Sequence, residues 1–293
     1  MIVVELKGGL GNQMFQYAFA SILAKKNSVP IKIDKSFFDL TERGLGHTPR
    51  NFELNIFNVS ILQATSSDFL LFHQLSTINK IKRKLGFNFP KIYNEPSFDF
   101  HQKGLSLKTP VFIKGYFQSY KYWINNEDFI KEYFSFSTTE LDCINKGLLL
   151  KLNEQITVAI HIRRGDYVND TLIHQTHGSC SLDYYLNAIK LLTSKNKNFT
   201  LVFFSDDSDW VKAQFKDLPY SKIIVDHNKG EDSWKDMLLM SSCHHNIIAN
   251  SSFSWWAAWL NKNPEKVVIA PKKWFANNEL EVKDLIPSEW IRL

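Results

Sequence analysis

The sequence predicts an α/β protein with a parallel, doubly wound sheet in its C-terminal half. Short apolar runs rich in β-branched residues alternate there with amphipathic segments of about a dozen residues, as in strands joined by crossover helices. A glycine-rich loop between a strand and a helix opens the chain. Clusters of arginine, aspartate, histidine and serine directly follow the apolar runs of the second half and predict a ligand site.

The first half begins with a β-loop-α-β unit. The apolar run Ile2–Val4 leads into the glycine-rich segment Lys7–Gly11, after which apolar side chains recur at helical spacing as far as Leu23. The other elements expected in this half are, in order, a strand at 31–33, short helices within 40–110, a strand at 111–113, and helices near 127–133 and 139–152.

The second half is regular. Its predicted strands are the apolar runs at 156–160, 201–204, 223–225, 247–249 and 267–270, and its predicted helices lie near 183–194, 208–216, 232–242 and 253–262. Because 293 residues fit about two domains, we divide the chain into an N-terminal α/β domain at 1–150 and a C-terminal domain at 151–293.

Composition excludes several classes of protein. Hydrophobic residues make up 44% of the chain and charged residues 22%, as in ordinary globular proteins, which argues against disorder and coiled coil. The net charge of +5 favours an anionic substrate such as a nucleotide diphosphate, but it is too small and too dispersed to predict nucleic-acid binding. The densest basic run predicts either a solvated helix face or contact with an anionic membrane, and it comprises Lys80, Lys82, Arg83 and Lys84.

The cysteines and the N-terminus indicate where the protein works. Cys143, Cys180 and Cys243 show neither zinc-ligand spacing nor a disulfide framework, which fits a reducing compartment. No segment resembles a signal peptide or reaches the ~18 apolar residues that span a bilayer. We therefore expect a cytoplasmic protein, at most peripheral to a membrane.

Four polar clusters follow the predicted strands of the second half: His161–Tyr167, Ser205–Asp207, Asp226–Asn228 and Asn250–Ser254. In open α/β sheets, ligands bind outside the carboxyl ends of the strands, so all four clusters belong to one candidate site. The guanidinium groups of Arg163 and Arg164 suit the oxygens of a diphosphate.

Each of these features also has a structural interpretation. Asp166 or Asp206 can pair with one arginine, leaving the other to face the ligand. Ser251 and Ser252 open a helix, where serine caps the helix and where the free N–H groups also favour phosphate.

Other motifs are weaker. Gly9 and Gly11 let the backbone approach a ligand, but the third glycine of a Rossmann fingerprint falls at Met14, although Asp34 is spaced like the ribose-binding acid. The D-x-D triplet Asp207–Asp209 resembles a metal-binding motif of sugar transferases, yet we interpret it as two acids at a helix start. We therefore expect no metal site.

Together, the motifs carry a resemblance. Gly8–Gln16, His161–Tyr167 and Asn250–Trp256, in this order and spacing, resemble the α-1,2-fucosyltransferases of glycosyltransferase family 11. Ser205–Asp207 and Asp226–Asn228 are similar to further shared blocks, so that the resemblance covers nearly the whole chain.

The resemblance implies a GT-B architecture, with two Rossmann-like domains facing a cleft. Residues 1–150 form the acceptor side, and residues 151–293 form the Rossmann-like domain that binds GDP-fucose. The implied reaction is inverting transfer of L-fucose from GDP-fucose to the 2-hydroxyl of a terminal β-galactose on an oligosaccharide or lipid-linked glycan, without a cofactor or essential metal. Because the sequence starts at the first strand, it resembles a soluble, bacterial-type member that builds a surface glycan.

The resemblance also implies roles for residues. Arg163 contacts the donor diphosphate, His161 lies near the nucleoside, and Asp226 is the candidate for guanine recognition. The other residues expected to bind the donor are Arg164, Asp206, Ser251, Ser252, Phe253 and, in the glycine loop that faces the reacting sugar, Gly9, Gly11 and Asn12.

The general base and the function itself have alternatives. Inversion calls for a carboxylate near the acceptor hydroxyl, for which Asp166 is the first choice and Asp170 and Glu5 are alternatives, unless the sugar departs early enough to need no strong base. The N-terminal unit with Asp34 also fits a nicotinamide-dependent oxidoreductase. The aromatic content of 14% also fits a non-enzymatic sugar-binding protein.

Overall fold

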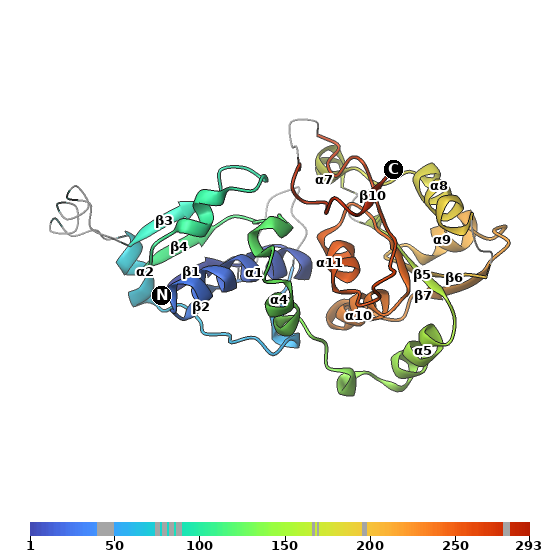
Figure 1. Cartoon of the computed structure of the whole chain (residues 1–293), viewed down its shortest axis with the longest axis horizontal. Helices are drawn as coiled ribbons and strands as arrows, with labels where there is room; N and C mark the ends of the chain where they lie inside the picture. The colour runs from blue at the N-terminus through green and yellow to red at the C-terminus, as the bar shows by residue number, and fades with distance from the viewer. Residues whose placement is uncertain are drawn as a thin grey trace. The chain divides into compact units, whose positions relative to one another are not determined.

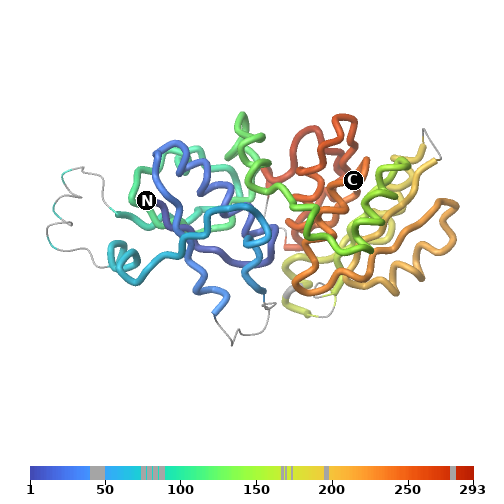
Figure 2. Tube along the Cα trace, turned by 90° about the horizontal axis from the view of Figure 1, so that it is seen from below, coloured from blue at the N-terminus to red at the C-terminus, as the bar shows by residue number. Residues whose placement is uncertain are grey.

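The computed structural model of the chain describes residues 1–39, 50–73, 77, 81, 85, 90–165, 168, 170–194, 198–277 and 282–293 (Figure 1). Their packing separates two compact units. The first unit lies within 1–39, 50–135 and 282–285, and the second holds the remaining described residues. The segment 282–285 therefore belongs with the first unit, although its neighbours in sequence, red like it in Figure 2, belong to the second. The division at residue 150 stays a prediction.

The first unit contains a four-stranded parallel sheet in the order β2-β1-β4-β3. The predicted strands form β1 (Ile2–Glu5), β2 (Ile31–Asp34) and β4 (Val111–Lys114). The sequence did not predict β3 (Lys91–Asn94), because only two apolar residues of this edge strand are partly covered. Because β1 and β4 pair in parallel, the carboxyl ends of these two strands are neighbours.

A long, almost wholly buried helix packs against this sheet. In α1 (Leu10–Asn27) every residue up to Leu23 except Asn12 is buried, and Lys25 and Lys26 lie in the last turn, where basic residues complement the helix dipole. The remaining helices of the unit are η1 (Leu54–Ile56), α2 (Ser66–His73), η2 (Gln102–Ser106), η3 (Tyr120–Trp123) and α4 (Glu127–Tyr133).

The second unit contains a six-stranded parallel sheet in the order β10-β9-β8-β5-β6-β7. Its strands are β5 (Thr157–Ile162), β6 (Thr200–Ser205), β7 (Ser221–Val225), β8 (His245–Ile247), β9 (Val268–Ala270) and β10 (Ile291–Arg292). All but β10 were predicted. The prediction placed His161 after its strand, but β5 continues through the buried Ile162, so that His161 lies within the strand.

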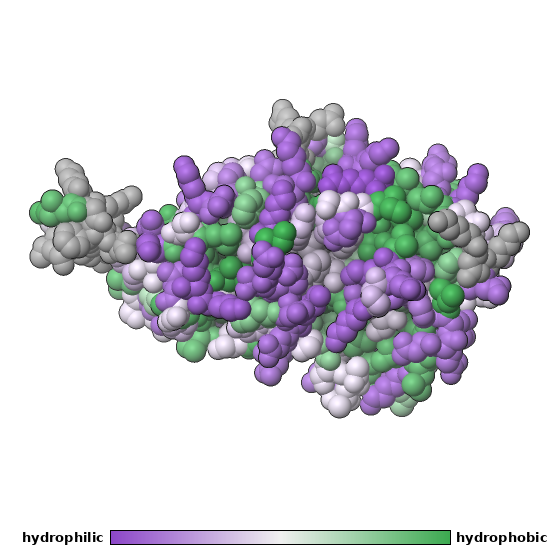
Figure 3. Space-filling model, viewed as in Figure 1, coloured by the Kyte–Doolittle hydropathy of each residue, from purple (hydrophilic) through white to green (hydrophobic). Residues whose placement is uncertain are grey.

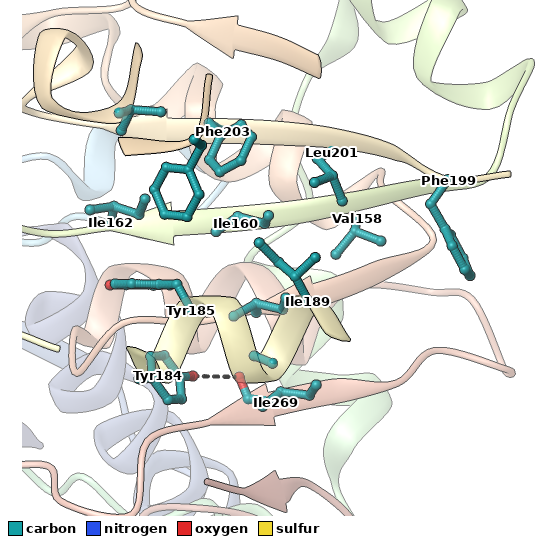
Figure 4. Close-up of a cluster of buried hydrophobic side chains, with 14 residues drawn as sticks. Val158, Ile160, Ile162, Tyr184, Tyr185, Ile189, Phe199, Leu201, Phe203 and Ile269 are labelled. Carbon is teal, nitrogen blue, oxygen red and sulfur yellow. Dashed lines mark hydrogen bonds between the residues drawn. The ribbon is translucent and has the colours of Figure 1, made fainter. Parts of the chain in front are cut away.

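Helices cover both faces of this sheet, which confirms the doubly wound prediction (Figure 1). On one face, α8 and α9 pack on the core drawn in Figure 4, and the hydroxyl of Tyr184 donates to the carbonyl of Ile269 over 3.1 Å. The helices of this unit whose bounds the structure describes are η4 (Thr138–Glu140), α5 (Cys143–Asn153), α7 (Thr171–His177), α8 (Leu182–Thr193), α9 (Ser208–Gln214), η5 (Gly230–Asp232), α10 (Trp234–Ser241) and α11 (Ser252–Leu260).

Hydrophilic side chains dominate the face of the molecule drawn in Figure 3. Within the described part of the chain, no helix combines the length and the apolar character that crossing a bilayer requires. The basic run proposed for contact with a membrane, Lys80 and Lys82–Lys84, lies outside the described residues.

The core beneath α8 yields a stability prediction. Ile189 is 2% exposed and packs against β5 and β6, whereas Leu191 on the same helix is 44% exposed (Figure 4). We expect Ile189→Ala to lower the free energy of unfolding by about 2–5 kcal/mol, because it leaves a cavity. Leu191→Ala should cost much less. Urea denaturation followed by intrinsic fluorescence measures both changes, and equal losses would contradict the placement of α8.

Candidate functional site

The candidate site lies where the sheet of the second unit changes its winding direction. β5 and β8 are hydrogen-bonded neighbours, while the chain continues to β6 on one side and to β9 on the other. The carboxyl end of β5 carries His161 and is followed by Arg163, and β8 is followed by Asn250 and Ser251. In open α/β sheets such a switch point is the usual ligand site. The fold therefore brings together two predicted clusters that are far apart in sequence.

His161 is a buried side chain with an unmet hydrogen-bonding capacity. It is 8% exposed, its ring centroid lies 5.8 Å from that of Phe253, and its Nδ1 is buried without a hydrogen-bond partner among the described residues. Burial lowers the pKa of His161 to about 4; nearby Asp206 favours the charged form and Arg163 opposes it. The imidazole is therefore neutral at physiological pH, and an unpartnered buried nitrogen is typical of a position that a ligand completes.

Beside His161, the start of α11 presents backbone N–H groups. Ser251 precedes the helix but makes no capping hydrogen bond with its side chain, and the first intrahelical bond runs from Trp255 N to Ser251 O over 3.0 Å. The cap that serine was expected to provide is therefore absent. The buried Asn250 fixes this turn, because its Nδ2 donates to the carbonyl of Trp274 over 3.0 Å. A helix start of this kind favours an anion such as phosphate.

Each arginine after β5 pairs with an aspartate of its own. Arg163 Nη1 lies 2.9 Å from Asp206 Oδ2, and Arg164 Nε lies 3.1 Å from Asp207 Oδ2. The guanidinium of Arg164 also lies 4.2 Å from the ring centroid of Trp210. Asp206 therefore pairs with one arginine, as the sequence indicated, and Asp207 pairs with the other, which the sequence did not predict; which arginine faces the ligand stays a prediction. Both guanidinium groups are held at the rim, each about one-fifth exposed.

The D-x-D triplet has the structural role that the sequence indicated. Asp207 precedes α9, and its Oδ1 accepts a hydrogen bond from Trp210 N over 3.1 Å, which caps the helix. Over the residues that the structure describes, no three His, Cys, Asp or Glu side chains are grouped so that they could hold a metal ion.

Asp226 lies on the same rim but at the outer strand β7, two strands from β5. Its carboxylate pairs with Lys212 over 3.1 Å. Behind it, a polar network that the sequence did not reveal joins Asn228 to Asn145 over 2.8 Å and to Asp236 over 2.8 Å. Burial raises the pKa of Asp236 to about 7. The sequence gave no signal of this network, because Asn145 and Asp236 are isolated polar residues within helices.

In the first unit, the glycine loop joins the ends of β1 and α1. Gly8 has φ 78°, and a Cβ there would lie 2.5 Å from Asn12 Nδ2, so this position requires glycine. Gly9 precedes α1 with φ −76°, and Gly11 is buried in its first turn. Asn12 Oδ1 accepts a hydrogen bond from Gln118 Nε2 over 2.8 Å. The predicted loop residues therefore lie together, but Gly8 carries the conformational constraint.

The N-terminus of α1 already holds an acid of the chain. Leu10 N donates to Glu53 Oε2 over 3.0 Å, and Gln13 Oε1 accepts from Glu53 N over 2.9 Å. Because a carboxylate already faces the positive end of this helix, α1 differs from α11 as a place for a ligand anion.

The three candidates for a general base lie in different surroundings. Asp166 is outside the described residues. Asp170 Oδ1 accepts from Leu172 N over 2.9 Å at the start of α7. Glu5 lies between Lys7 and Lys114, with oxygen–nitrogen distances of 3.2 and 3.1 Å. Which carboxylate acts stays a prediction.

Comparison with known proteins extends these observations. The sequence model of a family described as Glycosyl transferase family 11 matches residues 1–293. The chain is 34% identical to the O-antigen biosynthesis glycosyltransferase WbnK of Escherichia coli, over 98% of this chain and 99% of that protein. It is 31% identical to an alpha-1,2-colitosyltransferase of Escherichia coli, over 100% and 99% respectively. A galactoside 2-alpha-L-fucosyltransferase of Caenorhabditis elegans is 24% identical, over 100% of this chain and 79% of that protein.

Solved structures share the fold. An Arabidopsis thaliana FUT1 mutant in complex with GDP aligns with a TM-score of 0.53 at 13% identity, over 92% of this chain and 70% of that chain. POFUT1 in complex with GDP aligns with a TM-score of 0.52 at 12% identity, over 92% and 97%. These are GT-B-like fucosyltransferases, so the predicted fold class is confirmed.

The buried imidazole gives a pH prediction. Because the pKa of His161 is lowered to about 4 in the folded protein from an ordinary 6.5, we expect its ring to be neutral at pH 6. Its contribution to stability is complete above pH 6.5 and is lost as pH falls toward 4, since the unfolded chain takes up the proton first.

Nitrogen chemical shifts of the imidazole, assigned with a His161→Gln variant, report the protonation state directly. A ring that is half protonated near pH 6.5 would contradict the burial described here.

Proposed function

Because the chain belongs to glycosyltransferase family 11, we propose that it transfers L-fucose from GDP-fucose to the 2-hydroxyl of a terminal β-galactose, with inversion and without a metal. The family makes the chain a glycosyltransferase, which sets aside the oxidoreductase and the non-enzymatic sugar-binding protein. The donor, the acceptor and the stereochemistry belong to the proposal. The printed names of two relatives, an alpha-1,2-colitosyltransferase and a galactoside 2-alpha-L-fucosyltransferase, support an α-1,2 linkage.

The observation that carries the proposal is the arrangement at the β5–β8 switch point. It combines a braced guanidinium, the start of α11, where the Ser251 side chain makes no cap, and a buried imidazole whose Nδ1 has no partner in the part of the chain that the structure describes. The first two suit a diphosphate, and the third suits a polar group of a nucleoside. The terminal galactose that would accept the fucose carries no diphosphate, so this site fits the donor rather than the reacting end of the acceptor.

The mechanism follows from where charge develops. When the bond between sugar and phosphate breaks, negative charge accumulates on GDP and positive charge on the sugar. Arg163 and the first amides of α11 would hold the leaving diphosphate more tightly as this charge grows, which lowers the barrier. Asp206 holds the guanidinium of Arg163 in place beforehand, so that little reorganisation is needed during the reaction. Arg164, held by Asp207 and Trp210, adds positive charge at the same rim.

Base recognition would involve the outer part of the rim. A carboxylate can accept from N1 and N2 of guanine together, and Asp226 is the proposed acceptor. Its pairing with Lys212 is partly exposed and therefore weak enough for guanine to displace it. His161, being neutral, can offer one ring nitrogen as a donor or an acceptor to the nucleoside.

The donor sugar has a second candidate. The relative named as an alpha-1,2-colitosyltransferase is 31% identical over the whole of this chain. Colitose is fucose without its 3-hydroxyl, so the two donors differ by one polar group. A site that hydrogen-bonds this hydroxyl would reject colitose strongly, whereas an apolar site would discriminate little.

On the acceptor side, we assign the first unit and its glycine loop with Asn12 to the reacting sugars. Asp166 is the proposed general base, with Asp170 and Glu5 as alternatives. A pH–rate profile of Asp166→Asn separates a general base from a residue that only holds an arginine in place. If Asp166 is the base, the variant loses the rise of kcat that ionisation of this carboxyl produces. If Asp166 only holds an arginine, kcat falls by a similar factor at every pH.

The experiment that tests the function is a donor screen. Purified protein is incubated with lactose and, in turn, GDP-fucose, GDP-colitose, GDP-mannose or UDP-galactose, with and without EDTA, and the product linkage and anomeric configuration are read by NMR. We expect α-1,2-fucosyl-lactose from GDP-fucose at a rate that EDTA leaves unchanged. Preference for another nucleotide sugar, another linkage, or loss of turnover in EDTA would refute the corresponding part of the proposal.

Arg163 provides a direct prediction about catalysis. We expect Arg163→Ala to lower kcat by on the order of 10²–10³, since it removes a preorganised donor from the leaving diphosphate. Arg163→Lys should recover only part of the loss, because lysine keeps the charge but not the fork. Lys216→Ala, which removes an exposed cation of the same unit, serves as the control and should leave kcat unchanged. Near-wild-type turnover of Arg163→Ala would remove Arg163 from the mechanism.

A further inference from the structure

A carboxylate outside the predicted site lies partly buried at the carboxyl rim of the first sheet. Glu95 directly follows β3, and its two oxygens accept hydrogen bonds from consecutive backbone amides. Oε2 accepts from Tyr116 N over 2.6 Å, and Oε1 accepts from Phe117 N over 2.9 Å. These amides belong to the turn Gly115–Gln118, which follows the neighbouring strand β4.

The turn is shaped to receive this carboxylate. A Cβ at Gly115 would lie 2.4 Å from Glu95 Cβ, so glycine is required for the approach. Phe117 has φ 52°, a left-handed conformation that is unfavourable for a residue with a side chain. Its wholly buried ring stacks on Phe19 with centroids 4.1 Å apart. The carboxylate and the stacked ring together maintain a backbone that the chain would not adopt by itself.

The turn leads directly to the glycine loop. Gln118 is 6% exposed, and its Nε2 donates to Asn12 Oδ1 over 2.8 Å. Asn12 Nδ2 in turn lies 2.5 Å from the position that a Cβ of Gly8 would take. A continuous set of contacts therefore runs from Glu95 through the turn to the side chain of Asn12, across strands β3, β4 and β1.

We propose that Glu95 is a positioning residue, whose carboxylate fixes the Gly115–Gln118 turn and, through Gln118, sets the orientation of the Asn12 amide for the reacting sugars. The inference rests on the proposed function insofar as the Asn12 loop serves the reacting sugars. Glu95 itself does not act on the substrate; it acts through the backbone that it binds.

The charge state of Glu95 matters to this role. Burial raises the pKa of Glu95 to about 7, while the two amide bonds and the positive charge of Lys7 oppose this rise. The other titratable groups facing it are Tyr93 on its own strand and Tyr122 on η3, and burial raises the pKa of both, so both stay neutral. A protonated carboxyl carries a hydrogen on one oxygen and cannot accept equally well from two amides. Glu95 should therefore hold the Gly115–Gln118 turn less firmly as pH falls through about 7.

The contribution of Glu95 to the stability of the fold should change with pH in the opposite direction. A carboxyl whose pKa is raised from 4.5 to about 7 on folding binds its proton more tightly in the folded state. Its contribution to stability is complete below pH 4.5 and is lost as pH rises through about 7. Protonation of Glu95 therefore loosens the turn without unfolding the protein, and loss of acceptor turnover is separable from loss of fold.

The test is Glu95→Gln, which keeps the size and one acceptor oxygen but removes the charge and places an NH₂ group against one amide. Above pH 7, we expect kcat/KM for the acceptor to fall about 10- to 100-fold, with KM for the donor and the thermal midpoint little changed. The ratio of wild type to variant should shrink toward one as pH falls through about 7. The exposed Glu132→Gln in the same unit is the matched control and should behave as wild type.

Two further measurements keep the inference open to refutation. In an Asn12→Ala background, Glu95→Gln should have little additional effect on acceptor kcat/KM, because both changes interrupt one set of contacts. Hydrogen exchange at Tyr116 and Phe117 should accelerate in Glu95→Gln whatever the substrate is. Additive effects, a pH-independent ratio or unchanged exchange would overturn the positioning role. Failure of the donor screen alone would instead refute the proposed function, since the exchange measurement does not depend on it.

Discussion

The reversal of winding between β5 and β8 is the constraint on which the candidate donor site depends. β5 and β8 are parallel neighbours, but the chain crosses from β5 to β6 on one side and from β8 to β9 on the other. Among the described residues, no crossover helix therefore covers the carboxyl ends of these two strands. Arg163 and His161 come from one strand, and the start of α11 follows the other. In the first unit, β1 and β4 are also parallel neighbours, and the glycine loop and the Gly115–Gln118 turn meet at their carboxyl ends.

The two rims use equivalent positions differently. At the start of α1, the chain supplies its own carboxylate from Glu53, which satisfies the amide of Leu10. At the start of α11, the serine before the helix makes no cap, and the adjacent His161 has a buried nitrogen without a partner within the described structure. The start of α1 therefore already holds a carboxylate of the chain, whereas the start of α11, beside a buried imidazole, is the place that we propose for the donor diphosphate.

Burial acts on ionisable groups at both rims, in opposite directions. It lowers the pKa of His161 and raises that of Glu95, and in both cases the neutral form is favoured. For His161 this gives a neutral group that can bind a nucleoside without adding charge. For Glu95 it places the change of charge near neutral pH, because two amides and Lys7 offset only part of the cost of burial. The two arginines at the second rim instead pair with Asp206 and Asp207.

The sequence by itself determined the class of fold, most of the strands and the family. Hydrophobic periodicity and β-branched runs specify local structure directly, and the polar clusters after β5, β6, β7 and β8 identified the rim. Only the tertiary structure decided the order of the strands, the pairing of each arginine with a separate aspartate, and the burial of Glu95 beneath the turn after β4. β3 and β10 escaped prediction because edge strands bury few apolar residues. Pairing, register and desolvation depend on residues distant in the chain, and no local pattern in the sequence records them.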